Sequence, residues 1–208
     1  MSEIKQNGIL FILWSTIAGK ISFLISSVLI AMVMARVDIA ILDTIFAGGI
    51  GGLLLGIFLH KHHKIGKMTL AGTIAVPVGF WAAFILAGGM DLIFTLIGAN
   101  ADNPNINGIV NVIGIVFMGL LCGAIFGAII YGRKSIGLFS AVGGLISFPF
   151  GLLVGLFNSG HPIKAMLENQ LAVLGSIDLN FLAIITSFGI GIGLSMGLYE
   201  MLTHNQTR

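Results

Sequence analysis

The chain has 208 residues, of which 57% are hydrophobic and only 9% are charged, with 30 glycines and a formal net charge of +2. Soluble domains carry roughly a quarter charged residues, so this composition excludes an ordinary soluble protein. The small net charge gives no indication of nucleic acid as a partner, and the single cysteine, Cys122, excludes an internal disulfide. The sequence therefore predicts an all-α polytopic membrane protein, one integral domain over residues 1–208, whose surroundings are the lipid bilayer.

The first apolar segment is the hardest to delimit, because Lys20 interrupts it and leaves only Ile21–Ala35 uncharged before Arg36. One interpretation is an amphipathic leading helix followed by a short span that begins near Ser15. The other is a single long tilted helix from Gly8, with Lys20 snorkelling toward the headgroups. We favour the first.

Five further apolar segments are long enough to cross a bilayer. They are Ile39–Leu59, which is interrupted by Asp43, and the uncharged runs Met68–Met90, Gly108–Gly132, Ser135–Asn158 and Leu179–Tyr199. The sequence thus predicts six spans.

Two long connections separate these segments, at Met90–Asn107 and Gly160–Asn180. Their apolar patches, Leu92–Ile97 and Ile163–Leu174, are typical of helices that lie on or dip into the outer leaflet. Ala99–Asn107 is predicted to be a plain loop.

Basic residues favour one side of this topology. With the N-terminus in the cytoplasm, the cytoplasmic side receives Lys5, Lys61, Lys64, Lys67, Arg133, Lys134 and Arg208, and the outer side receives Arg36 and Lys164. Short cytoplasmic loops are enriched in lysine and arginine, so we expect both termini in the cytoplasm and the protein in the cell membrane.

Three glycine ladders with a GxxxGxxxG pattern recur about 70 residues apart. They are Gly48, Gly52 and Gly56; Gly119, Gly123 and Gly127; and Gly189, Gly193 and Gly197. Glycine at every fourth position leaves a groove along a helix that another backbone can approach closely. We therefore predict that the ladders are helix-packing faces, within the protein or toward a membrane-protein partner or second copy.

The repeat extends beyond the ladders. Pro77 matches Pro149 near the middle of two spans, where each is predicted to kink its helix, and Gly19–Ser22 is read as matching Gly66–Thr69. These matches predict three tandem helical hairpins, at about 15–60, 65–131 and 135–203, in a pseudo-threefold arrangement about the membrane normal. Spans two, four and six are placed toward the middle.

Asp43 and Lys20 are the candidate transport or coupling residues. Intramembrane acids are costly and often belong to ion or proton paths, but Asp43 can also be an interfacial residue near Arg36. Lys20 is either a charge partner for Asp43 or Glu200 or a boundary residue like its proposed match Lys67, and the boundary interpretation is better supported.

Other polar residues give weaker signals. His60, His62 and His63 form a cluster that can bind metal only if the turn folds them together, and a basic turn on anionic lipid explains them more simply. Glu200, after Tyr199, is predicted to be an interfacial anchor. We assign no catalytic, metal or cofactor residue, because no nucleophile, acid pair or ligand set is present.

The sequence therefore predicts a small transporter or channel-like protein that moves an ion or small solute, and not an enzyme. The internal repeats, the mid-span prolines and the lack of a soluble domain favour this function. The alternative is a non-catalytic subunit or anchor of a larger membrane complex, which the density of glycine ladders favours.

Overall fold

The computed structural model describes residues 8–34, 40–98, 103–158, 162–171 and 178–206. Its elements, in chain order, are the helices α1 (Gly8–Met34), α2 (Ala40–Phe58), α3 (Ile65–Leu96), α4 (Pro104–Tyr131), α5 (Ile136–Asn158), α6 (Pro162–Leu171) and α7 (Leu179–Gln206), with the 3-10 turns η2 (His62–Lys64) and η3 (Arg133–Ser135). All of these helices except α6 are long and apolar enough to cross a membrane. The structure supports an all-helical integral membrane protein with six spans.

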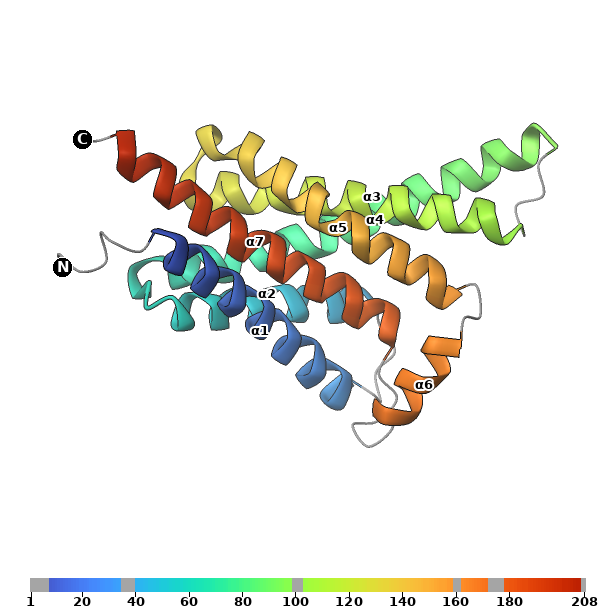
Figure 1. Cartoon of the computed structure of the whole chain (residues 1–208), viewed down its shortest axis with the longest axis horizontal. Coiled ribbons are helices and arrows are strands. Elements are labelled where there is room, and N and C mark those ends of the chain that lie inside the picture. The colour runs from blue at the N-terminus through green and yellow to red at the C-terminus, as the bar shows by residue number, and fades with distance from the viewer. Residues whose placement is uncertain (1–7, 35–39, 99–102, 159–161, 172–177, 207–208) are drawn as a thin grey trace.

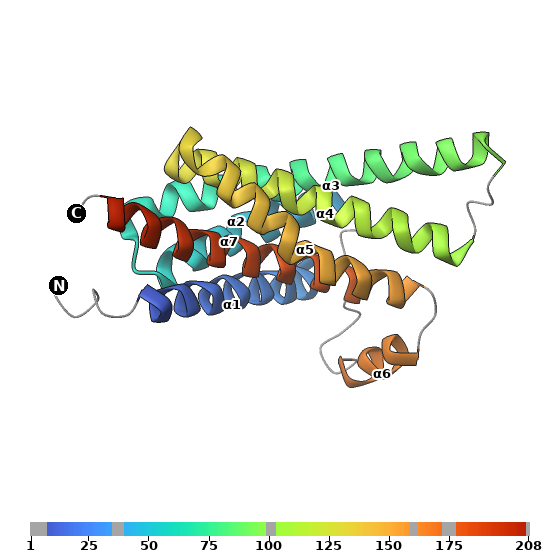
Figure 2. The same ribbon diagram turned by 45° about the horizontal axis from the view of Figure 1, so that its top comes forward.

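The six long helices pack as a ring in which each contacts the next, and α7 closes the ring against α1. The ring is tight at the end where α1 begins and α7 ends, which we call the termini end (Figure 1). At the opposite end, the splayed end, the α3–α4 pair diverges from α5 and α7, and α6 lies outside the long helices (Figures 1 and 2).

The ring corrects the expected central placement of spans two, four and six. The corresponding helices α4 and α7 contact each other, but α2 packs mainly between α1 and α3. Large side chains fill the middle of the bundle instead, including the rings of Phe23 and Phe126, which each meet the ring of Phe188 edge to face. Even so, α2, α4 and α7 are each more buried than any of the other three spans.

The first span is one continuous helix, so our preference for a leading helix followed by a short span is wrong. α1 runs for 27 residues through Lys20. The Lys20 side chain is exposed, so the helix continues without a charge in the packed interior. Ser22 donates a hydrogen bond to the Ala18 carbonyl of the preceding turn, which satisfies this buried hydroxyl within the helix.

The connection between α3 and α4 also differs from the prediction. Leu92–Leu96 continue α3 instead of forming a separate interfacial helix, and the helix ends just before Gly98, whose φ of 76° suits glycine. α4 begins at Pro104, within the segment expected to be loop, because proline is well suited to the first position of a helix. The other predicted interfacial segment does contain a short separate helix, α6, although residues 172–174 of that segment lie outside the described part.

The closest helix contacts occur at three pairs: α2 with α3, α4 with α5, and α7 with α1. At the first glycine of each ladder, an added methyl group would overlap a glycine of the neighbouring helix; the pairs are Gly48 with Gly72, Gly119 with Gly143, and Gly189 with Gly19. At the middle glycine it would overlap a backbone carbonyl oxygen; the pairs are Gly52 with Met68, Gly123 with Phe139, and Gly193 with Ser15. Backbone therefore meets backbone at these positions.

These contacts revise the register of the first span. Gly19 packs on a glycine of α7, as Gly72 packs on a glycine of α2, whereas a methyl group at Gly66 would meet nothing within 4 Å. The contacts do not support the match of Gly19 to Gly66 read from the sequence, because it paired a contact glycine with one in open space. The interpretation of Lys20 as a boundary residue relied on its match to Lys67, and that support is therefore removed.

Candidate functional site

A cavity of about 250 Å³ lies between α3, α4, α5 and α7 in the splayed half of the bundle. Its inner part is lined by apolar side chains, among them Phe80, Ile115, Met118, Val154 and Ile184. α3 and α4 diverge from α5 and α7 at the splayed end (Figure 2), and the cavity lining reaches Asn158 and Asp178, which are exposed at that end and mark its mouth. Concave, mostly apolar sites with a few polar groups are the usual form of small-molecule sites.

The polar groups of the cavity are three asparagines and one aspartate. Asp178 and Asn158 are exposed near the mouth, and the Asn180 amide donates a hydrogen bond of 3.1 Å from Nδ2 to Oδ1 of Asn158. Asp178 Oδ1 accepts a 2.8 Å hydrogen bond from the backbone N–H of Asn180 and so caps the start of α7. The bond between Asn180 and Asn158 joins the end of α5 to the start of α7 at the rim.

Asn111 lies deeper in the cavity than these groups. Gly155 of α5 packs beside Gly108 of α4, and Gly151 packs beside Val112, so Asn111 is level with about residue 152 of α5. Asn158 is six residues further along α5, which places Asn111 roughly 9 Å further into the bundle. Among the described residues, none forms a hydrogen bond with the Asn111 carboxamide.

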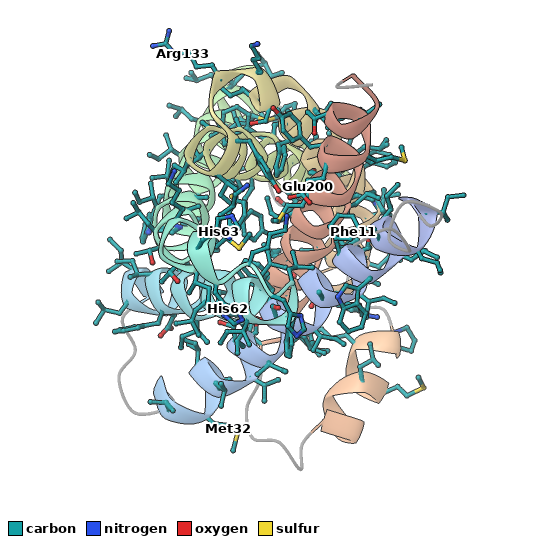
Figure 3. All side chains as sticks on the ribbon, turned by 90° about the vertical axis from the view of Figure 1, so that its left-hand side faces the viewer. Phe11, Met32, His62, His63, Arg133 and Glu200 are labelled. Carbon is teal, nitrogen blue, oxygen red and sulfur yellow. The ribbon has the colours of Figure 1, made fainter. Side chains whose placement is uncertain are left out.

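The termini end is closed by a layer of charged and aromatic side chains, which we call the closed layer: Lys61, Lys64, Tyr131, Phe139, Tyr199 and Glu200. The Lys61 ammonium forms an ion pair with Glu200 Oε1, and the Tyr131 hydroxyl donates to the same oxygen at 2.5 Å. The Lys61 and Glu200 side chains are only 17% and 25% exposed. Figure 3, which looks onto this end, shows Glu200 among the helices and Arg133 at the rim.

Aromatic rings complete the closed layer. Tyr131 stacks against Tyr199 at 4.7 Å and against Phe139 at 5.6 Å between ring centroids. The Lys64 ammonium lies 4.4 Å from the centre of the Tyr131 ring, a cation–π contact. Lys61 also lies 5.8 Å from the ring of Phe11, so the layer reaches α1. Side chains from the turn before α3 and from α4, α5, α7 and α1 thus meet at one level.

Packed side chains fill the bundle between the cavity and the closed layer. Cys122, one turn beyond the cavity floor at Met118, is fully buried, and its thiol donates to the Ala75 carbonyl. Phe126, Phe188 and other fully or nearly fully buried residues continue this core toward the termini end. The cavity is therefore open at one end and blocked at the other.

The residues singled out from the sequence lie away from the cavity. Asp43 is in the first turn of α2, near the splayed end, where the helix dipole stabilises an acid. Lys20 is exposed near the middle of α1, and the Glu200 suggested as its partner is bonded to Lys61. Neither Asp43 nor Lys20 is among the described residues that line the cavity.

The histidines and prolines have no part in the cavity either. His60, His62 and His63 are exposed at the turn between α2 and α3, and the described residues include no group of three His, Cys, Asp or Glu that could hold a metal. α3 and α5 continue through Pro77 and Pro149. The predicted kinks at these prolines stay predictions.

Sequence reasoning missed the closed layer and the asparagines of the cavity. Tyr199 and Glu200 were treated as an interfacial anchor because nothing in the sequence pairs Glu200 with a lysine 139 residues earlier. The sequence feature that could have indicated the cavity was Asn111, a carboxamide within an otherwise apolar span. Comparisons with protein-family models, curated proteins and solved structures found no match.

Proposed function

We propose that this protein is a small membrane transporter that exposes the cavity alternately to the two sides of the bilayer. The observation that carries the proposal is the asymmetry of the bundle, with a cavity open at the splayed end and a closed layer at the termini end. Alternating access requires a state of this kind, because a solute must be reachable from one side while the other is sealed.

In this proposal the closed layer is the gate at the cytoplasmic side. The termini end carries Lys61, Lys64, Lys67, Arg133 and Lys134, and the positive-inside rule assigns such an end to the cytoplasm. Opening requires the Lys61–Glu200 ion pair to separate and the rings around Tyr131 to part. Water that enters as the gate opens would rehydrate both charges and lower the cost of breaking the pair.

The glycine contacts supply candidate rigid bodies for this motion. Because backbones touch directly in the pairs α2–α3, α4–α5 and α7–α1, we expect each pair to move as a unit. The equivalent positions of Gly19, Gly72 and Gly143 in the three pairs support a reading of the chain as three hairpins with pseudo-threefold symmetry. In that reading each of these three glycine-paired contacts joins a ladder helix to the first helix of the next hairpin, and the third returns to the first.

The test requires no knowledge of the solute. In a Cys122→Ala background, Ala83→Cys places a thiol on the cavity wall, and a membrane-impermeant maleimide is applied to either side of sealed vesicles. A transporter should label from both sides, more slowly from the termini side. Glu200→Gln, which breaks the ion pair of the closed layer, should speed labelling from that side only.

Phe126→Cys, in the same background, is the matched control because its side chain is fully buried in the core. We expect little labelling of it from either side. Labelling of Ala83→Cys from the splayed side alone, with or without Glu200→Gln, would contradict alternating access.

The second candidate function, a membrane-embedded subunit, is favoured by Lys20. This residue lies nine positions after Phe11, which is level with the closed layer, and hence about 13 Å further into the bilayer. It is exposed on α1 and has no hydrogen-bond or ion-pair partner among the described residues. An acidic group on a partner helix would stabilise this charge.

A photoactivatable amino acid at Ile17, which is 48% exposed one turn before Lys20, tests the subunit function. A subunit should give one discrete protein adduct that disappears in Lys20→Leu. A twofold increase in mass would identify a second copy of this chain, and adducts with lipid alone would contradict the subunit function.

A further inference from the structure

The arrangement of polar groups in the cavity indicates what kind of molecule it takes. We propose that the cavity binds a neutral amphiphile, meaning an uncharged molecule with one apolar chain and a small hydrogen-bonding head group. The inference deepens the proposed transport function, on which it rests for the role of the bound molecule as substrate.

The inner part of the cavity suits an apolar chain. Its floor and walls are side chains such as Met118, Ile115, Val154 and Phe80, which offer dispersion contacts and no hydrogen bonds. At roughly 30 Å³ for a group the size of a methylene or water, a cavity of about 250 Å³ holds about eight such groups. About seven carbons and a small head group therefore fill this volume, and a longer chain would place its head group nearer the mouth.

Two amide groups of residues that line the cavity have hydrogen-bonding capacity that the described residues do not use. The Asn111 carboxamide has no hydrogen-bond partner among the described residues, although it lies within a membrane span. The Oδ1 atom of Asn180 is buried and likewise has no partner within the described part of the chain. Unsatisfied polar groups are costly in an apolar setting, and a hydroxyl or amide head group can both donate to and accept from such amides.

The same groups disfavour a charged ligand. Asp178 is the only ionisable side chain among the described residues that line the cavity, and it lies exposed at the rim with one oxygen bonded to the backbone of α7. A cation or anion bound at the level of Asn111 would have no opposite charge beside it. The cost of moving an ion out of water would then be uncompensated.

The experiment uses the full chain in lipid nanodiscs and a photoactivatable 1-decanol with a diazirine on its chain. We expect saturable labelling that maps to Phe80–Ala87 and Val110–Met118, the cavity segments of α3 and α4. Decanoate and decylammonium with the same diazirine should bind at least tenfold more weakly. Asn111→Leu should weaken decanol binding about fivefold, the value of roughly one hydrogen bond, and leave binding of the headless decane analogue unchanged.

Matched tryptophan substitutions on α3 provide the control. Ala83→Trp fills the cavity and should abolish labelling, whereas Ile85→Trp, at a position that is 72% exposed, should not. Equal binding of the charged probes, or labelling outside the cavity segments, would overturn the inference.

The outcome is separable from the test of transport. Decanol binding together with one-sided labelling of Ala83→Cys would keep the amphiphile site and reject transport. Two-sided labelling without decanol binding would keep transport and reject this class of substrate.

Discussion

The two ends of the bundle differ in how closely the long helices are held together and in what their polar side chains contact. At the termini end, an ion pair, two tyrosines and phenylalanine rings join α1, α4, α5, α7 and the turn before α3, with side chains from distant parts of the chain meeting at Glu200. At the splayed end, α3 and α4 diverge from α5 and α7, and the space between them is a cavity with amides on its wall. The contrast shows that polar groups close one end and are left available at the other.

Glycines of the same helical bundle also differ in what surrounds them. Gly52 and Gly193 have backbone atoms of the next helix where a side chain would lie, whereas Gly88 and Gly89, near the splayed end of α3, have nothing within 4 Å. Glycine therefore indicates close packing only where a neighbouring backbone is present to use the space.

The largest expected effect comes from filling the glycine contacts. Leucine at Gly52, Gly123 or Gly193 would force two backbones apart, and overpacking of this kind costs about 1–3 kcal/mol or more per site. We expect each variant to unfold at a lower temperature in detergent, as followed by circular dichroism. Gly89→Leu is the matched control from the splayed end and should unfold as the parent does. A parental unfolding temperature for all three ladder variants would show that the ladders are not contact faces.

The next effect concerns the closed layer. Glu200→Gln leaves Lys61 without its carboxylate, and Lys61→Met leaves Glu200 without its ammonium, so each single change should cost about 1–3 kcal/mol for a pair that is only partly exposed. The double variant should lose less than the sum, because no unpaired charge is left. Denaturation of the four proteins measures this coupling, and strictly additive losses would show that the pair does not stabilise the closed end.

A smaller effect is expected at the splayed end of α2. Asp43→Asn removes a charge from the first turn of the helix and should change stability by less than about 1 kcal/mol. The same variant tests whether Asp43 couples transport to an ion or proton. Loss of gradient-driven flux of a bound solute with intact folding would support coupling, whereas equal flux would leave Asp43 as a boundary residue.

The least disruptive substitutions test which end of the bundle faces the cytoplasm. The proposed gate assumes that this is the termini end. Single cysteines at Asn103 and Lys134 lie at exposed positions beside helices at the splayed and termini ends. An impermeant thiol reagent applied to whole cells should reach position 103 and leave position 134 unmodified. The reverse pattern would place the closed layer outside and reverse the proposed direction of access.

Composition and pattern were sufficient to predict the class of protein. Long uncharged runs such as Leu179–Tyr199 have no stable alternative to a helix that satisfies its own backbone in lipid, so the six spans follow from the sequence. Helix ends were less predictable. Asp91 ended the predicted span but not α3, because a charge ends an apolar run without breaking a helix, and the turn came only at Gly98.

Only the tertiary structure decided which helices touch and what their polar residues do. The sequence by itself determined the helices and the glycines that allow close approach, because both depend on residues near one another in the chain. It did not determine that α7 packs on α1, that Glu200 meets Lys61, or that Asn111 faces a cavity. Each of these depends on contacts between segments far apart in the chain, where many pairings of similar apolar helices bury similar surface.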